Sequence, residues 1–266
     1  MADTKKYRGA VFFDVDGTLI DERIGVSVPT QATREAIARL RENGYLACVA
    51  TGRAKCYLCE LQVEFDCYVT CNGAIVELNG EVFAQYMEDS KLKALLAHLD
   101  EKGFGFSFET HEKCYVGAKK SEEFMHAMRE SKIDTKNFTV TDDFDGLRFC
   151  KAMITFTDEA EYKILCEKFG GDFDIVQHHT DPEADINLAG ISKATGVARV
   201  LELTGIDREN TYAFGDGAND AELFGTVGCG IAMTPHSSAL DGVAKMVTGG
   251  VADGGIPNAL VKLGLI

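Results

Sequence analysis

The chain has 266 residues, 45% hydrophobic and 26% charged, which is ordinary composition for a globular protein with room for one large core or two modest ones. Its formal net charge of −15 argues against binding to nucleic-acid backbones, which requires clustered Lys and Arg. No stretch reaches the roughly 18 consecutive apolar residues of a membrane helix, and Asp14 interrupts the first apolar run, which is too short for a signal peptide, so we expect a cytoplasmic protein.

The N-terminal part of the chain alternates short apolar runs with helical periodicity. In chain order the expected elements are a strand over 10–16, a helix over 28–44, a strand over 45–53, a helix over 54–64 and a strand over 67–74. Thr30 is suited to cap the first helix and Gly44 to end it. A βαβαβ beginning predicts an α/β fold with a doubly wound parallel sheet.

The middle of the chain breaks this alternation. Asn79-Gly80, between two alternating runs, predicts a β-hairpin. Helical and strand patterns then mix, with strands expected over 104–109, 113–117, 148–156 and 173–178. The βα alternation returns near the C-terminus. The simplest organisation is one sheet domain formed by residues 1–85 and 188–266, with a second α+β domain inserted at 86–187.

Small and acidic residues gather at the expected carboxyl ends of the strands, where open α/β sheets bind ligands. The segments at these ends are Asp14–Thr18, Thr51–Arg53, Asn72–Gly73 and Gly215–Asp220. Turns alone account for Gly, Asp and Asn at any one end. They account poorly for four acids together (Asp14, Asp16, Asp216 and Asp220), because the mutual repulsion of these acids requires a cation. Mg²⁺ is the natural counter-ion, since it takes oxygen ligands and is commonly held by carboxylates such as Asp14 and Asp216 together with a substrate phosphate.

The spacing of Asp14 and Asp16 suggests a division of chemical work. Residues two apart in an extended chain lean to the same side. One carboxylate can attack phosphorus as a nucleophile, while the other donates a proton to the leaving oxygen and later accepts one from water. Asp14 ends a rigid strand and suits the nucleophile, and Asp16 lies in a turn and suits the general acid/base.

Lys193 stands in the first turn of a helix that Ser192 is expected to cap. A cation there opposes the helix dipole, and a local rule broken without compensation tends to mark a functional site. An anion bound at this helix start would be held by backbone N–H groups and by the lysine together. We therefore expect Lys193 to bind phosphate, although an isolated lysine would more often be a solvated surface residue.

Four motifs in this order, "DVDGTL", "ATGR", "GISKATG" and "GDGAND", resemble those of the haloacid dehalogenase (HAD) superfamily. The chain is similar to its Cof-like sugar-phosphatase branch in particular. The features of that branch are "NGA" after the third strand, a large inserted α/β cap and a late "GIAM", found here at 72–74, about 86–187 and 230–233. The resemblance implies Mg²⁺-dependent hydrolysis of a phosphate monoester, most plausibly a sugar phosphate, through a phosphoaspartate.

The resemblance also implies roles for individual residues. Asp14 is the nucleophile and Asp16 the acid/base; Thr51, Gly52 and Lys193 bind the transferring phosphoryl group. Asp216 holds Mg²⁺ together with Asp14 and the Asp16 carbonyl. Asp220 supports the metal site without binding the ion directly, and Asn219 orients Lys193 or phosphate contacts. Because their motifs lie at the same sheet edge, Arg53 and Asn72 are candidate substrate contacts, and Glu109, Arg148 and Asp185 are weaker ones from the inserted domain.

Three other interpretations stay open at this point. A phosphomutase of the same superfamily would return the phosphoryl group to a sugar, and a non-catalytic sensor would only bind a phosphorylated metabolite. Cys56, Cys59, Cys67 and Cys71 have a spacing that invites a zinc site, but a buried packing role is favoured for them. The sequence predicts neither the oligomeric state nor the individual substrate.

Overall fold

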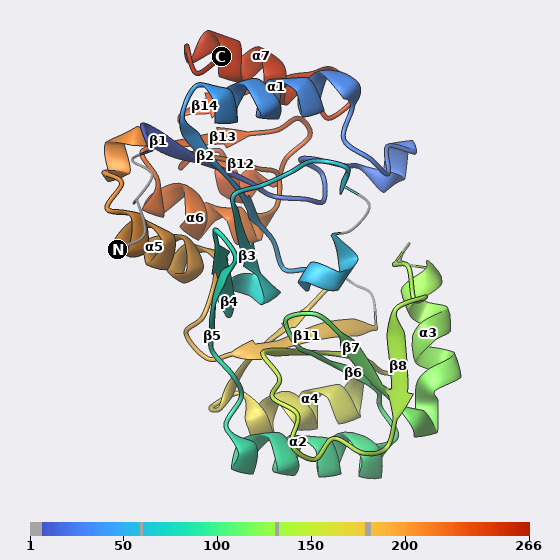
Figure 1. The fold of residues 1–266 in the computed structure, drawn as a ribbon. Coiled ribbons are helices and arrows are strands. Elements are labelled where there is room, and N and C mark those ends of the chain that lie inside the picture. The colour runs from blue at the N-terminus through green and yellow to red at the C-terminus, as the bar shows by residue number, and fades with distance from the viewer. Residues whose placement is uncertain (1–6, 59–60, 131–132, 179–181) are drawn as a thin grey trace. The chain divides into compact units, whose positions relative to one another are not determined.

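The structure is a computed structural model that describes residues 7–58, 61–130, 133–178 and 182–266. The chain divides into two compact units (Figure 1). The first unit comprises Met1–Gly52, Cys59–Phe83 and Ser192–Ile266, and the second comprises Arg53–Leu58 and Ala84–Ile191. The functional division into a catalytic core and a cap stays a prediction.

An eight-stranded sheet, counted over the described residues, forms the centre of the first unit in the order β14-β13-β12-β1-β2-β3-β4-β5. Its strands are β1 (Gly9–Phe13), β2 (Tyr45–Ala50), β3 (Cys67–Thr70), β4 (Ile75–Leu78), β5 (Glu81–Ala84), β12 (Thr211–Gly215), β13 (Cys229–Ala232) and β14 (Met246–Val247). β1 pairs in parallel with both β2 and β12, so strands from the two ends of the chain lie side by side. The predicted parallel sheet is confirmed.

Helices cover both faces of this sheet, as Figure 1 shows. They are α1 (Gln31–Glu42), α5 (Lys193–Thr204), α6 (Ala221–Thr226) and α7 (Gly255–Lys262). On one face Phe12 of β1 packs in a cluster with Val197 of α5 and Phe224 of α6. On the other, α1 packs against α7. All five residues of β1 are buried, as expected for a central strand that is covered on both faces.

Local sequence signals explain the elements that lead to the site. Thr30 caps α1 by accepting a hydrogen bond from the Thr33 N–H at 3.2 Å, as predicted. The Asn79-Gly80 turn between β4 and β5 has positive φ at both residues, which confirms the predicted hairpin. Ser192 caps α5 through the Thr195 N–H, and this places Lys193 at the first helical position.

A six-stranded mixed sheet forms the second unit in the order β10-β11-β9-β6-β7-β8, counted over the same described ranges. Its strands are β6 (Gly105–Glu109), β7 (Cys114–Gly117), β8 (Phe138–Thr141), β9 (Lys151–Thr155), β10 (Phe173–Gln177) and β11 (Glu183–Leu188). Its helices are α2 (Asp89–Lys102), α3 (Ser121–Glu130) and α4 (Glu159–Phe169). The short 3₁₀ turn η2 (Lys55–Tyr57) also belongs to this unit.

The two faces of the second sheet differ in chemistry because side chains alternate along each strand. Phe108 and Ile154 lie in an apolar cluster with Leu95 of α2 and Leu165 of α4. The alternate positions of β6, β9 and β11 carry polar and charged groups that are nevertheless buried. These groups are Ser107, Glu109, Lys151, Glu183, Asp185 and Asn187. The second unit therefore has one apolar face, while its other face combines these buried polar groups with a second apolar cluster, formed by Cys114, Val116, Phe124, Met128 and Met153.

The structure corrects part of the predicted secondary structure. The helix predicted over 54–64 is wrong for the residues described there: Lys55–Tyr57 forms a 3₁₀ turn, residues 62–64 are not helical, and Gln62 has a φ of 50°, which a right-handed helix does not permit. Cys56 and Tyr57 instead pack against the cluster of Cys114, Val116, Phe124, Met128 and Met153 in the second unit, while Leu58 and Leu61 are also buried. Strands β8 and β11 were not predicted.

The remaining general features concern cysteines and membranes. Eight cysteines lie in the described residues and none of these forms a disulfide; the ninth, Cys59, lies outside them. Over the same residues, groups of side chains suited to hold a metal ion contain aspartates and no cysteine. No helix in the described segments has the length and apolar character needed to cross a bilayer.

Candidate active site

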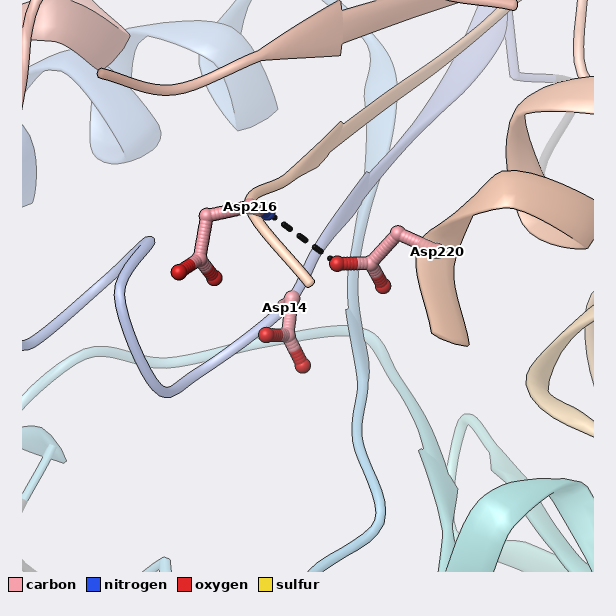
Figure 2. Close-up of side chains that lie close together, drawn as sticks. All are labelled: Asp14, Asp216 and Asp220. Carbon is pink, nitrogen blue, oxygen red and sulfur yellow. Dashed lines mark hydrogen bonds between the residues drawn. The ribbon is translucent and has the colours of Figure 1, made fainter. Parts of the chain in front are cut away.

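Three carboxylates meet at the carboxyl ends of β1 and β12. Asp14 directly follows β1, and its N–H donates to the Phe214 carbonyl of β12 at 3.0 Å. Carboxylate oxygens of Asp14, Asp216 and Asp220 all lie within 4.8 Å of one another (Figure 2). The parallel pairing of β1 with β12 causes this meeting, because it aligns the ends of two strands about 200 residues apart in sequence.

Lys193 places a buried cation against two of these carboxylates. Its Nζ donates to Asp14 Oδ1 at 2.6 Å and to Asp220 Oδ1 at 2.9 Å. The lysine is only 3% exposed, although it occupies the first turn of α5. The dipole penalty noted in the sequence is therefore offset by two charge-assisted hydrogen bonds.

Asp220 is fully buried and holds the turn after β12. Its Oδ2 accepts hydrogen bonds from the backbone N–H groups of Asp216 at 3.1 Å and Gly217 at 3.0 Å, the first of which is drawn in Figure 2. Its Oδ1 accepts from Lys193. A Cβ at Gly215 would overlap the Asp220 carboxyl group, so glycine is required there. Both oxygens of Asp220 are occupied by protein donors, and the residue fixes Asp216 and Lys193 in place.

The loop after Asp14 passes close to Asp216. Gly17 has a φ of 77°, and a Cβ on it would overlap the Asp216 carboxylate. Asp16 forms an isolated bridge with Ile20 and is exposed, unlike Asp14, which is 6% exposed. The two aspartates named from the "DVD" motif thus differ sharply in environment: one is buried against a lysine and the other faces solvent.

Protonation equilibria show that the cluster has more acid than its lysine can balance. Burial raises the pKa of Asp14 to about 8, against the opposing pull of Lys193. Burial and the neighbouring Asp220 raise the pKa of Asp216 to about 6. For Lys193, burial alone would lower the pKa, but Asp14 and Asp220 outweigh it and raise the pKa above its ordinary value. The site is suited to a further cation.

The other strand ends bring polar groups to the same edge. Thr51 follows β2, is 2% exposed, and accepts a hydrogen bond at its carbonyl from the Asn72 N–H at 3.1 Å. A Cβ on Gly52 would lie 2.8 Å from Asn72 Oδ1, so the absence of a side chain lets Asn72 approach. Gly73, with a φ of 96°, lies against the Ser192 carbonyl at the start of α5.

Arg53 and Asn219, also named from the sequence, are not among the side chains that form the cluster of Asp14, Lys193, Asp216 and Asp220. Arg53 follows Gly52 directly in sequence but groups with the second unit. Asn219 is exposed in the 3₁₀ turn η7 (Ala218–Asp220), and the side chains that bind Lys193 Nζ are Asp14 and Asp220. The roles of Arg53 and Asn219 stay predictions.

Sequence reasoning missed an arginine beside the acids. Arg23 Nη2 lies 3.8 Å from Asp216 Oδ2, and Arg23 is held by Asp21 through hydrogen bonds of 2.8 and 3.0 Å. No periodicity or spacing could reveal this contact, because it depends on how the loop after β1 folds back.

The sequence profile of the haloacid dehalogenase-like hydrolases matches residues 11–260. The chain belongs to this family. This HAD hydrolase is a phosphatase, and its resemblance to the Cof-like branch is confirmed.

Full-length relatives support this assignment. The hydrolase is 29% identical over 265 residues to a Bacillus subtilis protein named "Putative phosphatase YkrA", with 96% of this chain and 98% of the relative covered. A crystal structure of a hypothetical protein from Geobacillus kaustophilus superposes with a TM-score of 0.86 at 32% identity, covering 97% and 100% of the two chains. The HAD subclass IIB sugar phosphatase BT4131 superposes with a TM-score of 0.80 at 25% identity, covering 97% and 100%.

The acidic cluster of this HAD hydrolase fits the divalent metal that the family uses. Asp220 has no free oxygen, because Lys193 and two backbone amides occupy both. Over the described residues, Asp14 Oδ2 and the Asp216 carboxylate accept no hydrogen bond, and an all-oxygen donor set matches the preference of Mg²⁺. Burial raises the pKa of both Asp14 and Asp216, so their charged forms are costly without a partner, and a dication would stabilise those charged forms.

Proposed function

We propose that this phosphatase hydrolyses small phosphate monoesters, in particular sugar phosphates, through a phosphoaspartate on Asp14 and with Mg²⁺ as cofactor. The observation that carries the proposal is the placement of Lys193 Nζ between Asp14 and Asp220, with Asp216 in the same cluster. Phosphoryl transfer requires a nucleophile, a cation that stabilises the phosphoryl group and carboxylates that can hold a metal ion. Asp14, Lys193 and the pair of Asp14 and Asp216 would supply these groups.

In the proposed first step, an Asp14 carboxylate oxygen attacks phosphorus while the bond to the leaving-group oxygen breaks. Asp16 donates a proton to that oxygen, so the product leaves as an alcohol. Asp16 suits this exchange because it is exposed two residues from Asp14 and can reach both substrate and water. In the second step Asp16 takes a proton from water, whose oxygen attacks phosphorus and releases phosphate and the Asp14 carboxylate.

The remaining residues would bind and orient the phosphoryl group. Lys193 supplies a charge that stays fixed as negative charge moves between oxygens, and Thr51 and the Gly52 N–H lie at the neighbouring strand end. Asp14, Asp216 and the Asp16 carbonyl would hold Mg²⁺, which when bound neutralises phosphate charge and lets a dianion enter an acidic site. Asp220 would act by holding Lys193 and Asp216, and it touches no substrate.

Support for a sugar phosphate comes from the relative that is a sugar phosphatase, while Arg53, Asn72 and the second unit are the proposed determinants of the leaving group. In the same proposal residues 1–85 and 188–266 form the catalytic core and 86–187 the cap. Lids of this kind exclude bulk water and select the substrate.

The proposal is tested by phosphate release from p-nitrophenyl phosphate and from a panel of sugar phosphates, with MgCl₂ and with EDTA. Asp14→Asn should abolish turnover, with a loss of at least about 10³-fold, because the amide is not a nucleophile. Asp207→Asn, which neutralises an exposed aspartate before the 3₁₀ turn η6 (Arg208–Asn210), is the matched control and should keep wild-type turnover.

The other candidate functions give different results in this assay. A mutase would move phosphate between positions of a sugar bisphosphate and release little of it. A sensor would bind phosphate esters without turnover and would form no phosphoaspartate in an acid quench. Activity that survives both EDTA and Asp14→Asn would contradict the proposed mechanism.

A further inference from the structure

Arg23 supplies a second cation to the acidic cluster, at a different carboxylate from the two that Lys193 contacts. Lys193 bonds to Asp14 and Asp220, whereas the ion-pair partner of Asp216 in the described part of the chain is Arg23. The distance of 3.8 Å from Nη2 to Asp216 Oδ2 is within ion-pair range and beyond hydrogen-bond range. Arg23 therefore lowers the electrostatic cost of the Asp216 charge without occupying the lone pairs of its oxygens.

The position of Arg23 is built into the loop and does not depend on a chance surface rotamer. Asp21 is 7% exposed and binds Arg23 through both carboxylate oxygens, at 2.8 Å to Nε and 3.0 Å to Nη2. The Asp21 oxygen also accepts from the Arg23 backbone N–H at 3.1 Å. Paired backbone hydrogen bonds between Asp21 and Val26, at 2.8 and 3.0 Å, close the loop around this arrangement.

The Arg23 side chain remains 65% exposed beyond its anchor. In the described residues its Nη1 group donates to no protein acceptor, so the guanidinium is fixed at one edge and open to water at the other. An anchored, hydrated cation a few ångströms from a carboxylate exerts a field on anything else that binds that carboxylate. Its effect on a second cation is repulsive.

We propose that Arg23 is the resident counter-cation of Asp216: it stabilises the metal-free cluster and thereby weakens the binding of Mg²⁺ at that carboxylate. The inference rests on the proposed function, because it requires Mg²⁺ at Asp216. Arg23 is a positioning residue in this scheme and takes no part in bond making. Its consequence is a metal site that exchanges its ion readily, since the protein without metal keeps a partner for Asp216.

The proposal predicts that the interaction free energy of Arg23 with Asp216 appears in two measurements: the stability of the metal-free protein and the affinity for Mg²⁺. Removing the charge of Arg23 should destabilise the metal-free protein and tighten Mg²⁺ binding. The two changes are linked, because raising the free energy of the metal-free state makes the binding of Mg²⁺ more favourable by a similar amount. The metal-saturated protein should change less in stability, since the ion then takes over the compensation of Asp216. A merely structural role for Arg23 would instead lower both stabilities equally and leave affinity unchanged.

The experiment is calorimetric titration of the full-length protein with MgCl₂, together with thermal unfolding with and without saturating MgCl₂. Arg23→Gln should lower the Kd for Mg²⁺ by about three- to ten-fold, the effect of one unit charge a few ångströms away in a partly hydrated site. Arg23→Lys keeps the charge without the planar fork and should stay within about two-fold of wild type. Arg39→Gln removes a charge from an exposed position on α1 and is the control for net charge.

Salt provides an independent check. The difference between Arg23→Gln and wild type should shrink in about 1 M KCl, where the Debye length falls to about 3 Å. An unchanged or weaker Mg²⁺ affinity in Arg23→Gln would overturn the role assigned to Arg23 while leaving the proposed phosphatase mechanism intact. Failure of the wild-type protein to bind Mg²⁺ at all would instead overturn the metal site itself, and with it this inference.

Discussion

Lys193 in the first unit and Lys151 in the second are 3% and 5% exposed, and each contacts two carboxylates. Lys193 Nζ lies 2.6 and 2.9 Å from its two partners, Asp14 and Asp220. Lys151 Nζ lies 2.8 Å from Asp185 but 3.8 Å from Glu109. The first lysine is held tightly by both acids, whereas the second is held mainly by one.

The difference between the two clusters is one of charge balance. Around Lys151, a histidine adds a second cation: His178 Nε2 lies 3.2 Å from Asp185 Oδ1 and Nδ1 lies 3.8 Å from Glu183 Oε2. Glu109, Glu183 and Asp185 therefore face two cations, Lys151 and His178. The three acids of the Lys193 cluster also have two cations nearby, but the second of these, Arg23, is 65% exposed and lies 3.8 Å from Asp216. Weaker compensation of that kind suits a site for a ligand cation, while the closer pairing around Lys151 is compatible with a role in holding a sheet together.

The largest expected effect is that of Lys193→Met. The change leaves Asp14 and Asp220 without their cation, and we expect turnover to fall by about 10²–10³-fold and unfolding free energy by about 3–5 kcal/mol. Phosphate release and urea denaturation measure the two. Saturating MgCl₂ should recover part of the lost stability, because the ion adds positive charge to the same cluster; no recovery would show that the metal binds elsewhere.

Lys151→Met is the matched change in the second unit. It also removes a buried cation from two acids, and the same reasoning predicts a loss of about 3 kcal/mol in unfolding free energy. Here MgCl₂ should restore nothing, and turnover of p-nitrophenyl phosphate should fall by less than about ten-fold, far less than in Lys193→Met. Equal losses of turnover in the two variants would show that the second cluster also serves the chemistry.

Neutralising one acid of each pair sharpens the comparison. Asp220→Asn replaces an acceptor of three hydrogen bonds and should cost about 1–3 kcal/mol, with a fall in turnover as Lys193 and Asp216 lose their support. Glu109→Gln keeps a polar side chain and removes the charge that lies 3.8 Å from Lys151, so it should cost less than Asp220→Asn. Denaturation midpoints of the two variants test this order, and its reversal would mean that distance is a poor guide to coupling here.

The smallest expected effect depends on pH. The neighbouring carboxylates of Asp185 and Glu183 raise the pKa of His178 to about 9, above the value of about 6.5 for an unfolded chain. Protonated His178 therefore contributes its full stability below about pH 6.5 and loses it as pH rises towards 9. The stability difference between wild type and His178→Gln should fall over that interval by at most about 1 kcal/mol, since the side chain is partly hydrated. A difference that is flat with pH would contradict the assignment.

Sequence patterns predicted the elements whose signals are local. The α1 helix, the hairpin at Asn79-Gly80 and the parallel order of β1 to β3 follow from caps, turn residues and apolar runs that lie within each segment. Lys193 could be singled out because it breaks a helix rule beside glycine-rich acidic turns. Such features need no knowledge of what the rest of the chain does.

What the patterns missed depends on distant partners. β11 carries Glu183 and Asp185 at buried positions, so its sequence lacks the apolar pattern that predicts a buried strand. These acids can be buried because Lys151 and His178 contact them, which the sequence of the strand does not indicate. β8 is a short, exposed strand at the edge of its sheet, with little apolar signal. The 54–64 segment has helical periodicity, but the chain passes from the second unit to the first after Leu58, so its apolar residues do not belong to one helical face. The contact of Arg23 with Asp216 could not be predicted either, because the two residues are distant in sequence.

The central place of β1 also has a consequence for biosynthesis. β1 leaves the ribosome early, but its neighbour β12 is made about 200 residues later, so at typical elongation rates β1 waits roughly 10–40 seconds for one of its two edges to be paired. During that interval a strand of five buried residues has an open side. Nascent chains of this protein are therefore expected to be clients of ribosome-associated chaperones, and the acidic cluster is complete only once Asp216 and Asp220 have been synthesised.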